Sequence, residues 1–209
     1  TALLSPQGKY LADFFIIPDG DGFLLDVPAE QADDLLRRLT MYKLRAKVDI
    51  TEDPRAVTRG TGPAPEGAIA DPRDPALGWR GSGLGTDDAT DWDAIRVEHL
   101  VPEAGLELIP NDSFILEMGF ERLHGVDFRK GCYVGQEVTA RMKHKTELRK
   151  GLARVALDGP VPPGTPILTA DGREAGTVFT QSGGRGIAYL RFDRIGQGMS
   201  AAGVPVHPA

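Results

Sequence analysis

The stretch YLADFFIIPDGDGFLLDVPAEQADDLLRRLTMY, residues 10–42, decides the fold class. It contains two short apolar runs, residues 10–17 and 23–27, on either side of a turn rich in Gly and Asp. This arrangement predicts a β-hairpin. Pro28 then stands where a first helical residue is expected, and apolar residues recur at helical spacing at Ala32, Leu35, Leu36, Leu39 and Tyr42. The pattern predicts an amphipathic helix packed on a sheet.

The segments that follow complete an α+β pattern. Residues 47–51 and 55–58 are predicted as further strands, and the order β-β-α-β is typical of the α+β class. The remaining predictions are loops around short strands over residues 60–85, helices over 88–101 and 134–144, and a short helix or turn over 111–120.

From residue 148 onward the sequence changes to short apolar runs separated by Gly and Pro. The runs cover residues 152–157, 166–169, 176–180, 187–192 and 204–207. Regular turn signals of this kind predict a small all-β module, either a barrel or a sandwich. A boundary near Glu147 divides the chain into regions 1–147 and 148–209.

The composition of the 209 residues narrows the class of protein. Apolar residues make up 41% and charged residues 26%, which is ordinary globular usage. The net charge of −6 disfavours nucleic-acid binding through phosphates, because that mode needs a basic surface. The apolar runs are too short for a membrane helix, and the opening residues do not resemble a signal peptide. Four histidines without ligand spacing predict no metal site.

The chemistry is expected around the single cysteine, Cys132. Arg129 and Lys130 precede it and a helix is predicted to begin after it; both cations and a helix N-terminus stabilise a thiolate. Gly131 and Gly135 permit either close backbone approach to a ligand or a positive φ. The alternative is a small buried side chain beside a turn, as for most free cysteines.

A basic run follows in this acidic chain. Glu137 and Arg141 stand four residues apart and predict an ion pair on the helix surface. The later cations of the run are Lys143, His144, Lys145, Arg149 and Lys150. The run forms either a solvated face or a contact for an anion such as a polyglutamate tail or an RNA phosphate.

The octapeptide KGCYVGQE, residues 130–137, resembles the signature K-G-C-Y-x-G-Q-E of the YgfZ-type folate-binding proteins. These proteins are relatives of the glycine-cleavage aminomethyltransferase, or T-protein. Further stretches similar to family blocks are residues 7–9, 44–48, 105–110, 176–178 and 188–191. The resemblance implies α+β folate-binding domains around a central funnel, followed by a small β-barrel. It also implies that the N-terminal part of the family domain is absent from this sequence, which opens without Met.

The resemblance assigns roles to particular residues, with tetrahydrofolate as the cofactor. Lys130 and Cys132 are the expected catalytic residues, together with Asp13, which stands where T-proteins have an Asp-Asp pair. Glu117 lies in a segment that looks like the pterin-binding Leu-Glu-Ala-Gly of T-proteins, and a carboxylate suits the two coplanar donors of a pterin. The expected cofactor-binding residues are Glu117, Tyr133, Gly135, Gln136, Glu137 and Arg141. The alternatives are that Asp13 faces solvent and that Glu117 is a surface residue at a helix end.

Three functions are compatible with these observations. The first is a folate-binding accessory protein for assembly or repair of 4Fe–4S clusters, indirectly supporting tRNA modification. Its partners would be iron–sulfur client or assembly proteins in the bacterial cytosol or mitochondrial matrix. The second is an aminomethyltransferase-type enzyme that hands a one-carbon unit to tetrahydrofolate, so catalytic turnover stays open. The third, direct tRNA binding, is weakened by the acidic charge and few aromatics. The cysteine signature favours the first function, because T-proteins lack it.

Overall fold

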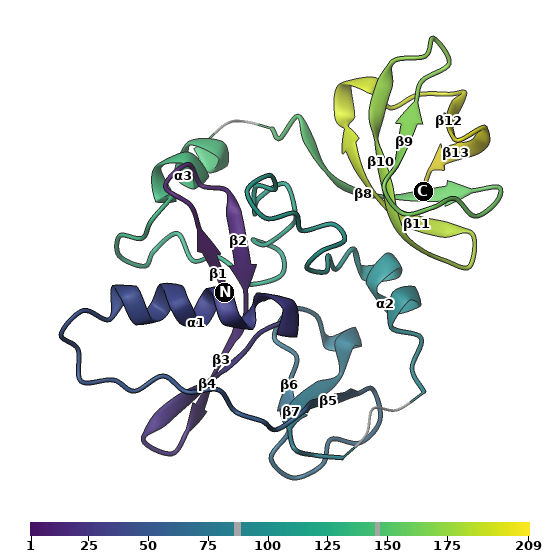
Figure 1. Ribbon diagram of the computed structural model, residues 1–209. Helices are drawn as coiled ribbons and strands as arrows, with labels where there is room; N and C mark the ends of the chain where they lie inside the picture. Colours follow the sequence, from purple (N-terminus) through teal and green to yellow (C-terminus); the bar gives the residue numbers. More distant parts are fainter. Residues whose placement is uncertain (86–88, 145–146) are drawn as a thin grey trace.

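The computed structural model describes residues 1–85, 89–144 and 147–209. Short sheets and helices make up the N-terminal region, and a β-barrel stands to one side of it (Figure 1). The elements before the barrel are β1 (Ala2–Leu4), β2 (Tyr10–Asp13), β3 (Phe15–Asp19), β4 (Gly22–Asp26), α1 (Ala29–Tyr42), β5 (Val57–Gly60), β6 (Ile69–Ala70), the 3-10 turn η1 (Pro75–Leu77), β7 (Trp79–Ser82), α2 (Trp92–His99) and α3 (Gln136–His144).

The predicted hairpin is confirmed as β3 and β4, but its first run, residues 10–17, is divided between β2 and β3. The two strands pair antiparallel, with Ile17 opposite Leu24. Gly20 in the turn between them has φ +56°, a backbone conformation that glycine adopts without steric cost. The strand β1, which the sequence analysis did not predict, pairs with β2. Its three residues are too few to show a period of two.

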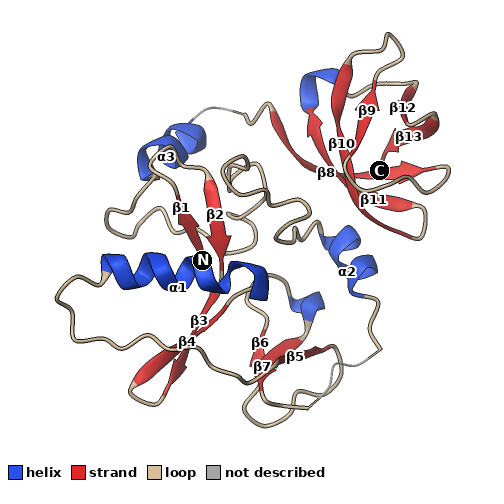
Figure 2. Ribbon diagram, viewed as in Figure 1, coloured by secondary structure: helices blue, strands red, loops and turns tan. Residues whose placement is uncertain are grey.

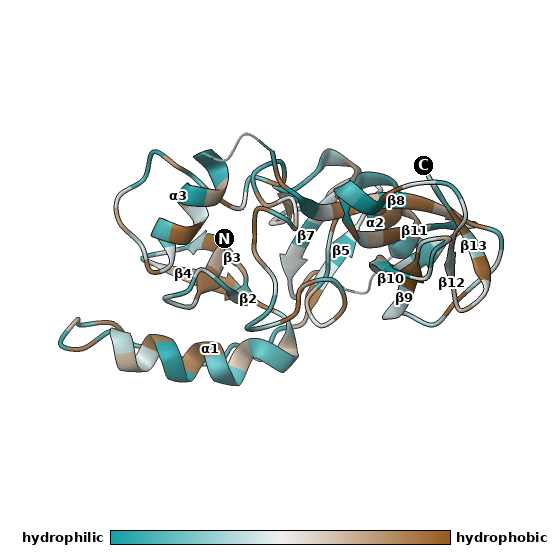
Figure 3. Ribbon diagram, turned by 90° about the horizontal axis from the view of Figure 1, so that it is seen from above, coloured by the Kyte–Doolittle hydropathy of each residue, from teal (hydrophilic) through white to brown (hydrophobic). Residues whose placement is uncertain are grey.

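The predicted helix is confirmed as α1, with Pro28 directly before its first residue. Within α1, all of whose residues are described, Leu35 is the buried residue, whereas Tyr42 at the end is 66% exposed. The side chain of Gln31 ties the helix to β2 by donating to the hydroxyl of Tyr10 at 3.0 Å. The helix therefore packs through a narrow stripe, not through the whole predicted apolar face, and Figure 3 shows it along one edge of the molecule.

The strand predicted over residues 47–51 is wrong. The segment alternates polar and apolar residues, but a strand needs a neighbour for its backbone hydrogen bonds, and no described segment pairs with this one. Val48 is accordingly 52% exposed. The strand predicted over residues 55–58 is displaced to β5, which pairs with β7 in the sheet β5-β7-β6.

Charged side chains join this small sheet to the hairpin. The guanidinium of Arg80 lies 2.5 Å from the carboxylate of Asp26 and 3.5 Å from that of Asp71. Arg73 pairs with Asp71 at 2.7 Å, and both guanidinium groups stack over the ring of Phe15. Burial acts to raise the pKa of Asp71, but the arginines outweigh it and hold the pKa below its ordinary value.

The two later helices begin where the local backbone allows. Asp91 caps α2, because its side chain accepts a hydrogen bond at 2.9 Å from a backbone N–H of the first turn. The predicted start of this helix, Asp88, lies outside the described residues. α3 begins two residues later than predicted, after Gly135, whose φ of +83° is not helical. Residues 111–120 form turns, which was one of the two predicted alternatives.

The C-terminal strands close into a barrel with the order β10-β11-β8-β13-β12-β9 (Figure 2). They are β8 (Lys150–Leu157), β9 (Thr165–Leu168), β10 (Glu174–Ser182), β11 (Arg185–Arg191), β12 (Met199–Ala201) and β13 (Val204–Pro208), with a 3-10 turn η2 (Phe192–Arg194). The predicted apolar runs fill its core, in which Val155, Ile167 and Val178 are fully buried. The all-β prediction is confirmed, as a barrel. β12 was missed because it is short and only Met199 in it is large and apolar.

Polar contacts join the barrel to the N-terminal region. The carboxylate of Glu107, in the turns before residue 110, accepts hydrogen bonds from the backbone N–H and the hydroxyl of Thr180 in β10. At the surface, Glu98 of α2 pairs with Arg154 at 2.6 Å and with Arg185 at 2.7 Å. Figure 1 and Figure 3 both show α2 as the helix beside the barrel. In the three described ranges, no helix combines the length and apolar content that crossing a membrane requires.

Candidate functional site

One hydrophobic cluster lies beneath the residues that the sequence singled out. Its buried members come from β1, β2 and the turns of residues 108–120. Tyr10 belongs to this cluster, and Tyr133 and Tyr189 pack against it from the 130–135 loop and from the barrel strand β11. A tyrosine ring buries apolar surface while its hydroxyl seeks a polar partner. The cluster therefore brings together three segments that are far apart in the sequence.

Asp13 is held by the first of these tyrosines. The fully buried Tyr10 donates its hydroxyl hydrogen to Oδ1 of Asp13 at 2.7 Å. Burial, and then the negative charge of Asp13 and the hydrogen bond to it, raise the pKa of Tyr10 well above its ordinary value. The phenol therefore stays a donor at any physiological pH. Asp13 is half-buried and hydrogen-bonded, so it does not simply face solvent.

Glu117 is held in the same way by the barrel. Tyr189 of β11 donates its hydroxyl to Oε2 of Glu117 at 2.6 Å. Burial, followed by the hydrogen bond to Glu117, raises the pKa of Tyr189. The backbone carbonyl of Glu117 also accepts from the N–H of Leu152 in β8, at 3.0 Å. Within the described part of the chain, Oε1 of Glu117 has no hydrogen-bond partner. Its contact with a pterin stays a prediction.

Two glycines seat the 130–137 loop against the turn between β1 and β2. A Cβ on Gly135 would lie 2.6 Å from the carbonyl oxygen of Ser5 and 3.0 Å from the Cα of Gly8. Gly8 has φ +74°, and a Cβ on it would lie 2.9 Å from the Cβ of Val138. The positive φ that was one of the two alternatives for Gly135 is confirmed, at +83°, and the missing side chain also lets two segments of the chain approach each other.

Replacing Gly135 with alanine is expected to lower the free energy of unfolding by about 2–4 kcal/mol, because the new methyl group needs both a strained φ and displaced backbone. Urea unfolding measures the difference. Gly131→Ala is the matched control, since a Cβ on Gly131 meets no atom within 4 Å. Equal stabilities of the two variants would contradict the packing role of Gly135.

The side chains of the loop close a turn before α3. The backbone N–H of Tyr133 donates to the amide oxygen of Gln136 at 3.0 Å, and Nζ of Lys130 lies 5.0 Å from the ring centre of Tyr133. The pKa of the Thr1 amino group is lowered, chiefly by burial; the negative charge of Asp13 opposes this shift, and the positive charges of Arg73 and Lys130 add to it.

Cys132 is exposed on this loop. The alternative of a small buried side chain is therefore wrong. The helix that was expected directly after the cysteine begins four residues later, at Gln136, so the thiol does not sit at the first turn of α3. Cys132 is thus open to solvent, two residues after Lys130.

The predicted ion pair on α3 is confirmed. Arg141 lies 2.8 Å from Glu137, and both side chains are largely exposed, at 66% and 83%. Lys143 pairs with Glu121 and stacks over the ring of Phe128, which neutralises part of the basic run. Lys145 lies outside the described residues. The assignment of Glu137 and Arg141 to cofactor binding stays a prediction.

Three residues escaped the sequence analysis in their observed roles: Tyr10 and Tyr189 at this site, and Glu107 at the contact with the barrel. Tyr10 and Tyr189 were visible as members of apolar strands, but a strand pattern does not reveal which carboxylate a hydroxyl meets. Glu107 stands in the run Leu106-Glu107-Leu108-Ile109, and a lone carboxylate among apolar residues was the one available signal of a buried pair.

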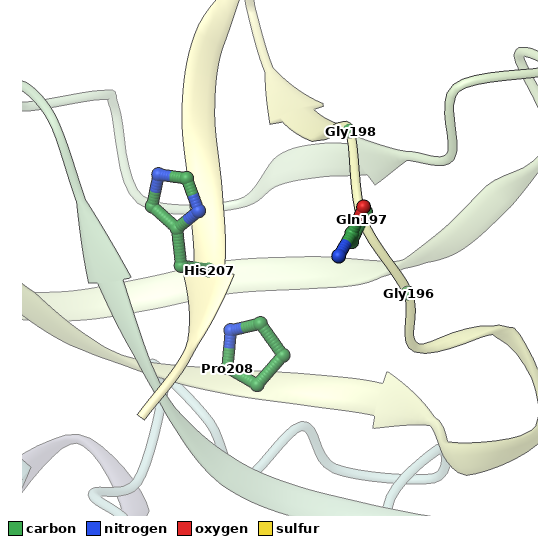
Figure 4. A pocket seen from close by; sticks show the side chains of 5 residues that line it. All are labelled: Gly196, Gln197, Gly198, His207 and Pro208. Carbon is green, nitrogen blue, oxygen red and sulfur yellow. The ribbon is translucent and has the colours of Figure 1, made fainter.

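A depression of about 530 Å³ lies at the barrel, away from these residues (Figure 4). It is lined by Gly196, Gln197, Gly198, His207 and Pro208. The residues predicted for catalysis or cofactor binding contribute nothing to this lining. The depression is therefore distinct from the site built on the tyrosine cluster.

Comparison with known proteins gives sequence relatives over most of the chain. The iron–sulfur cluster assembly factor IBA57, mitochondrial, of Mus musculus is 34% identical over 92% of this chain and 64% of its own length. The Homo sapiens protein of the same name is 31% identical over the same shares, and the Pyricularia oryzae homolog 32% over 92% and 62%. The chain thus spans slightly less than two thirds of the length of these relatives.

The fold comparison covers the whole chain. The crystal structure of the glycine cleavage system aminomethyltransferase T from Bartonella henselae matches with a TM-score of 0.65, over 99% of this chain and 73% of that one, at 13% identity. This likeness concerns the fold and confirms the expected aminomethyltransferase-like α+β architecture. Residues 149–209 match the family model of the CAF17 C-terminal β-barrel domain. The chain therefore has an aminomethyltransferase-like fold, and the family model of the CAF17 C-terminal β-barrel matches the part that closes into a barrel.

Proposed function

We propose that this protein binds tetrahydrofolate and supports the assembly or repair of iron–sulfur clusters in other proteins. One observation carries the proposal: two half-buried carboxylates, Asp13 and Glu117, are each fixed through one oxygen by a tyrosine of the cluster that also seats the Cys132 loop. The names of the mitochondrial assembly factors quoted above support the second half of the proposal.

The residues present fit a pterin. The half-buried Glu117 keeps Oε1 without a partner among the described residues, while Tyr189 holds the other oxygen. A pterin offers an amino group and a ring N–H in one plane, and a fixed carboxylate accepts such donors with strong, charge-assisted hydrogen bonds. Tetrahydrofolate would supply the one-carbon carrier. Glu117 would orient its ring, and Asp13 would lie beside the reactive part of the folate.

The cluster itself belongs to partner proteins in this proposal. Cys132 is exposed, and Lys130 places a positive charge two residues away over the ring of Tyr133. An exposed thiol beside a cation can meet a cysteine, sulfide or iron site on a client without rearrangement of the core. The partners are thus iron–sulfur client or assembly proteins, in the bacterial cytosol or the mitochondrial matrix.

The second candidate function is transfer of a one-carbon unit, as in aminomethyltransferases. The fixed carboxylate of Asp13 favours it, since a positioned carboxylate next to a folate can handle a proton. Only one Asp of the T-protein pair remains here, because the neighbours of Asp13 in the sequence are Ala12 and Phe14. Release of ammonia from an aminomethylated lipoyl carrier protein, in the presence of tetrahydrofolate, would establish this reaction; calorimetric binding of tetrahydrofolate without ammonia release would leave the accessory role.

Replacing Cys132 with alanine is expected to leave the fold intact and to abolish the support of cluster enzymes. Removal of an exposed sulfur creates little cavity, so the free energy of unfolding should stay within about 1 kcal/mol of the wild type. A deletion strain complemented with the variant should show low 4Fe–4S enzyme activity, whereas the wild-type protein should restore it.

In the purified wild type, bound tetrahydrofolate should slow alkylation of the Cys132 thiol. Full activity of the Cys132→Ala strain would remove the role of this residue.

A further inference from the structure

Asp13 is the proposed site residue with the most constrained surroundings. Tyr10, three residues before it, has no exposed surface, and its backbone is fixed on both sides: its N–H donates to the carbonyl of Ser113 at 2.9 Å, and its carbonyl accepts from the N–H of Asn111 at 2.8 Å. Because the backbone of Tyr10 is fixed and its ring is buried, the ring has little freedom to move toward a mobile carboxylate. The carboxylate of Asp13 must instead come to the hydroxyl.

The hydroxyl of Tyr10 has one hydrogen to donate and two side chains within hydrogen-bond distance. Asp13 Oδ1 lies 2.7 Å away, and the side-chain amide of Gln31, on α1, lies 3.0 Å away through Nε2 and 3.3 Å through Oε1. Because the charged oxygen is both nearer and the stronger acceptor, the hydrogen goes to Asp13. The amide nitrogen of Gln31 then donates to the tyrosine oxygen, so donors and acceptors match along a chain from Gln31 through Tyr10 to Asp13.

We infer that Tyr10, oriented by Gln31, is a positioning residue for Asp13 and thereby for tetrahydrofolate. The inference rests on the proposed function, because it takes Asp13 as part of the folate site. The chain of hydrogen bonds fixes Oδ1 and leaves Oδ2 without a partner in the described ranges. It also links the site to α1, through a residue of the helix that otherwise buries Leu35. The raised pKa of Tyr10 is consistent with a phenol that remains a donor.

The test compares wild type, Tyr10→Phe, Asp13→Asn and the double variant by calorimetry with tetrahydrofolate. Tyr10→Phe keeps the buried ring and should weaken binding about five- to tenfold. In the Asp13→Asn background it should change the affinity less than about twofold, because the charged oxygen that the Tyr10 hydroxyl positions is no longer present. Tyr42→Phe, at an exposed position, is the matched control and should bind as wild type does.

A second measurement needs no folate. The hydrogen of a buried phenol that is held by a carboxylate exchanges slowly with water, so NMR should show its resonance, which should vanish in Tyr10→Phe and shift in Asp13→Asn. Wild-type affinity retained in Tyr10→Phe, or a Tyr10 effect of the same size in the Asp13→Asn background, would overturn the inference alone. A missing hydroxyl resonance would overturn it as well. A wild type that shows the resonance but does not bind tetrahydrofolate would overturn the proposed function, and the positioning role with it.

Discussion

Replacing Glu117 with alanine is expected to weaken tetrahydrofolate binding about ten- to a hundredfold. A hydrogen bond to a charged group contributes about 1.5–3 kcal/mol, and each 1.4 kcal/mol changes a dissociation constant tenfold. The carboxylate is half-buried beside the hydrophobic cluster, where its hydrogen bonds are less screened by water than at the surface. Isothermal calorimetry of the purified variant measures the change.

Two further variants separate ligand contact from loss of structure. Glu117→Ala also leaves the hydroxyl of Tyr189 without its acceptor, so Tyr189→Phe shows how much of the effect comes from that hydrogen bond. We expect Tyr189→Phe to weaken binding less than Glu117→Ala does. Glu66→Ala removes an exposed carboxylate and should not change the affinity. Wild-type affinity in Glu117→Ala would refute the assignment of this residue to the pterin.

Local patterns in the sequence predicted the elements whose formation depends on neighbours in the chain. The hairpin β3–β4 and the helix α1 follow from a Gly/Asp turn, Pro28 and the spacing of apolar residues, and the barrel follows from regular turn signals. Residues 47–51 carry an equally good strand pattern and still form no strand. The difference is that a strand pattern states which face would be buried but not whether another strand lies alongside.

The candidate site was predictable to the extent that it lies in a short motif. The octapeptide at residues 130–137 pointed to the exposed Cys132 and to Lys130 beside it. The tyrosines that bind the two carboxylates could not be predicted from a short motif, since Glu117 and Tyr189 are 72 positions apart. Even Tyr10 and Asp13, three positions apart, point to opposite faces in an ideal strand, so their hydrogen bond was not expected.

Replacing Glu107 with alanine is expected to cost about 3–5 kcal/mol of stability, more than the Gly135→Ala substitution costs. Oε2 of this carboxylate accepts from the guanidinium of Arg96 at 2.6 Å and from the N–H of Glu103 at 2.9 Å. Oε1 accepts from the hydroxyl and the N–H of Thr180, at 2.6 and 3.2 Å. Glu107 and Arg96 are 1% and 4% exposed, so the variant would leave several buried donors without an acceptor.

Thr180→Val tests the same contact if Glu107→Ala does not fold. It removes one hydroxyl with little change of shape and should lower the free energy of unfolding by about 1–2 kcal/mol. Glu52→Ala, at an exposed position, should not change the free energy of unfolding measurably.

The carboxylate of Glu107 bonds to α2 and its neighbouring turn on one side and to the barrel on the other, so its loss should also uncouple the two regions. Urea unfolding of Glu107→Ala should then show a shallower or two-step transition, whereas the wild type should show a single steep one. A single transition of unchanged midpoint would mean that the apolar contacts alone hold the barrel in place.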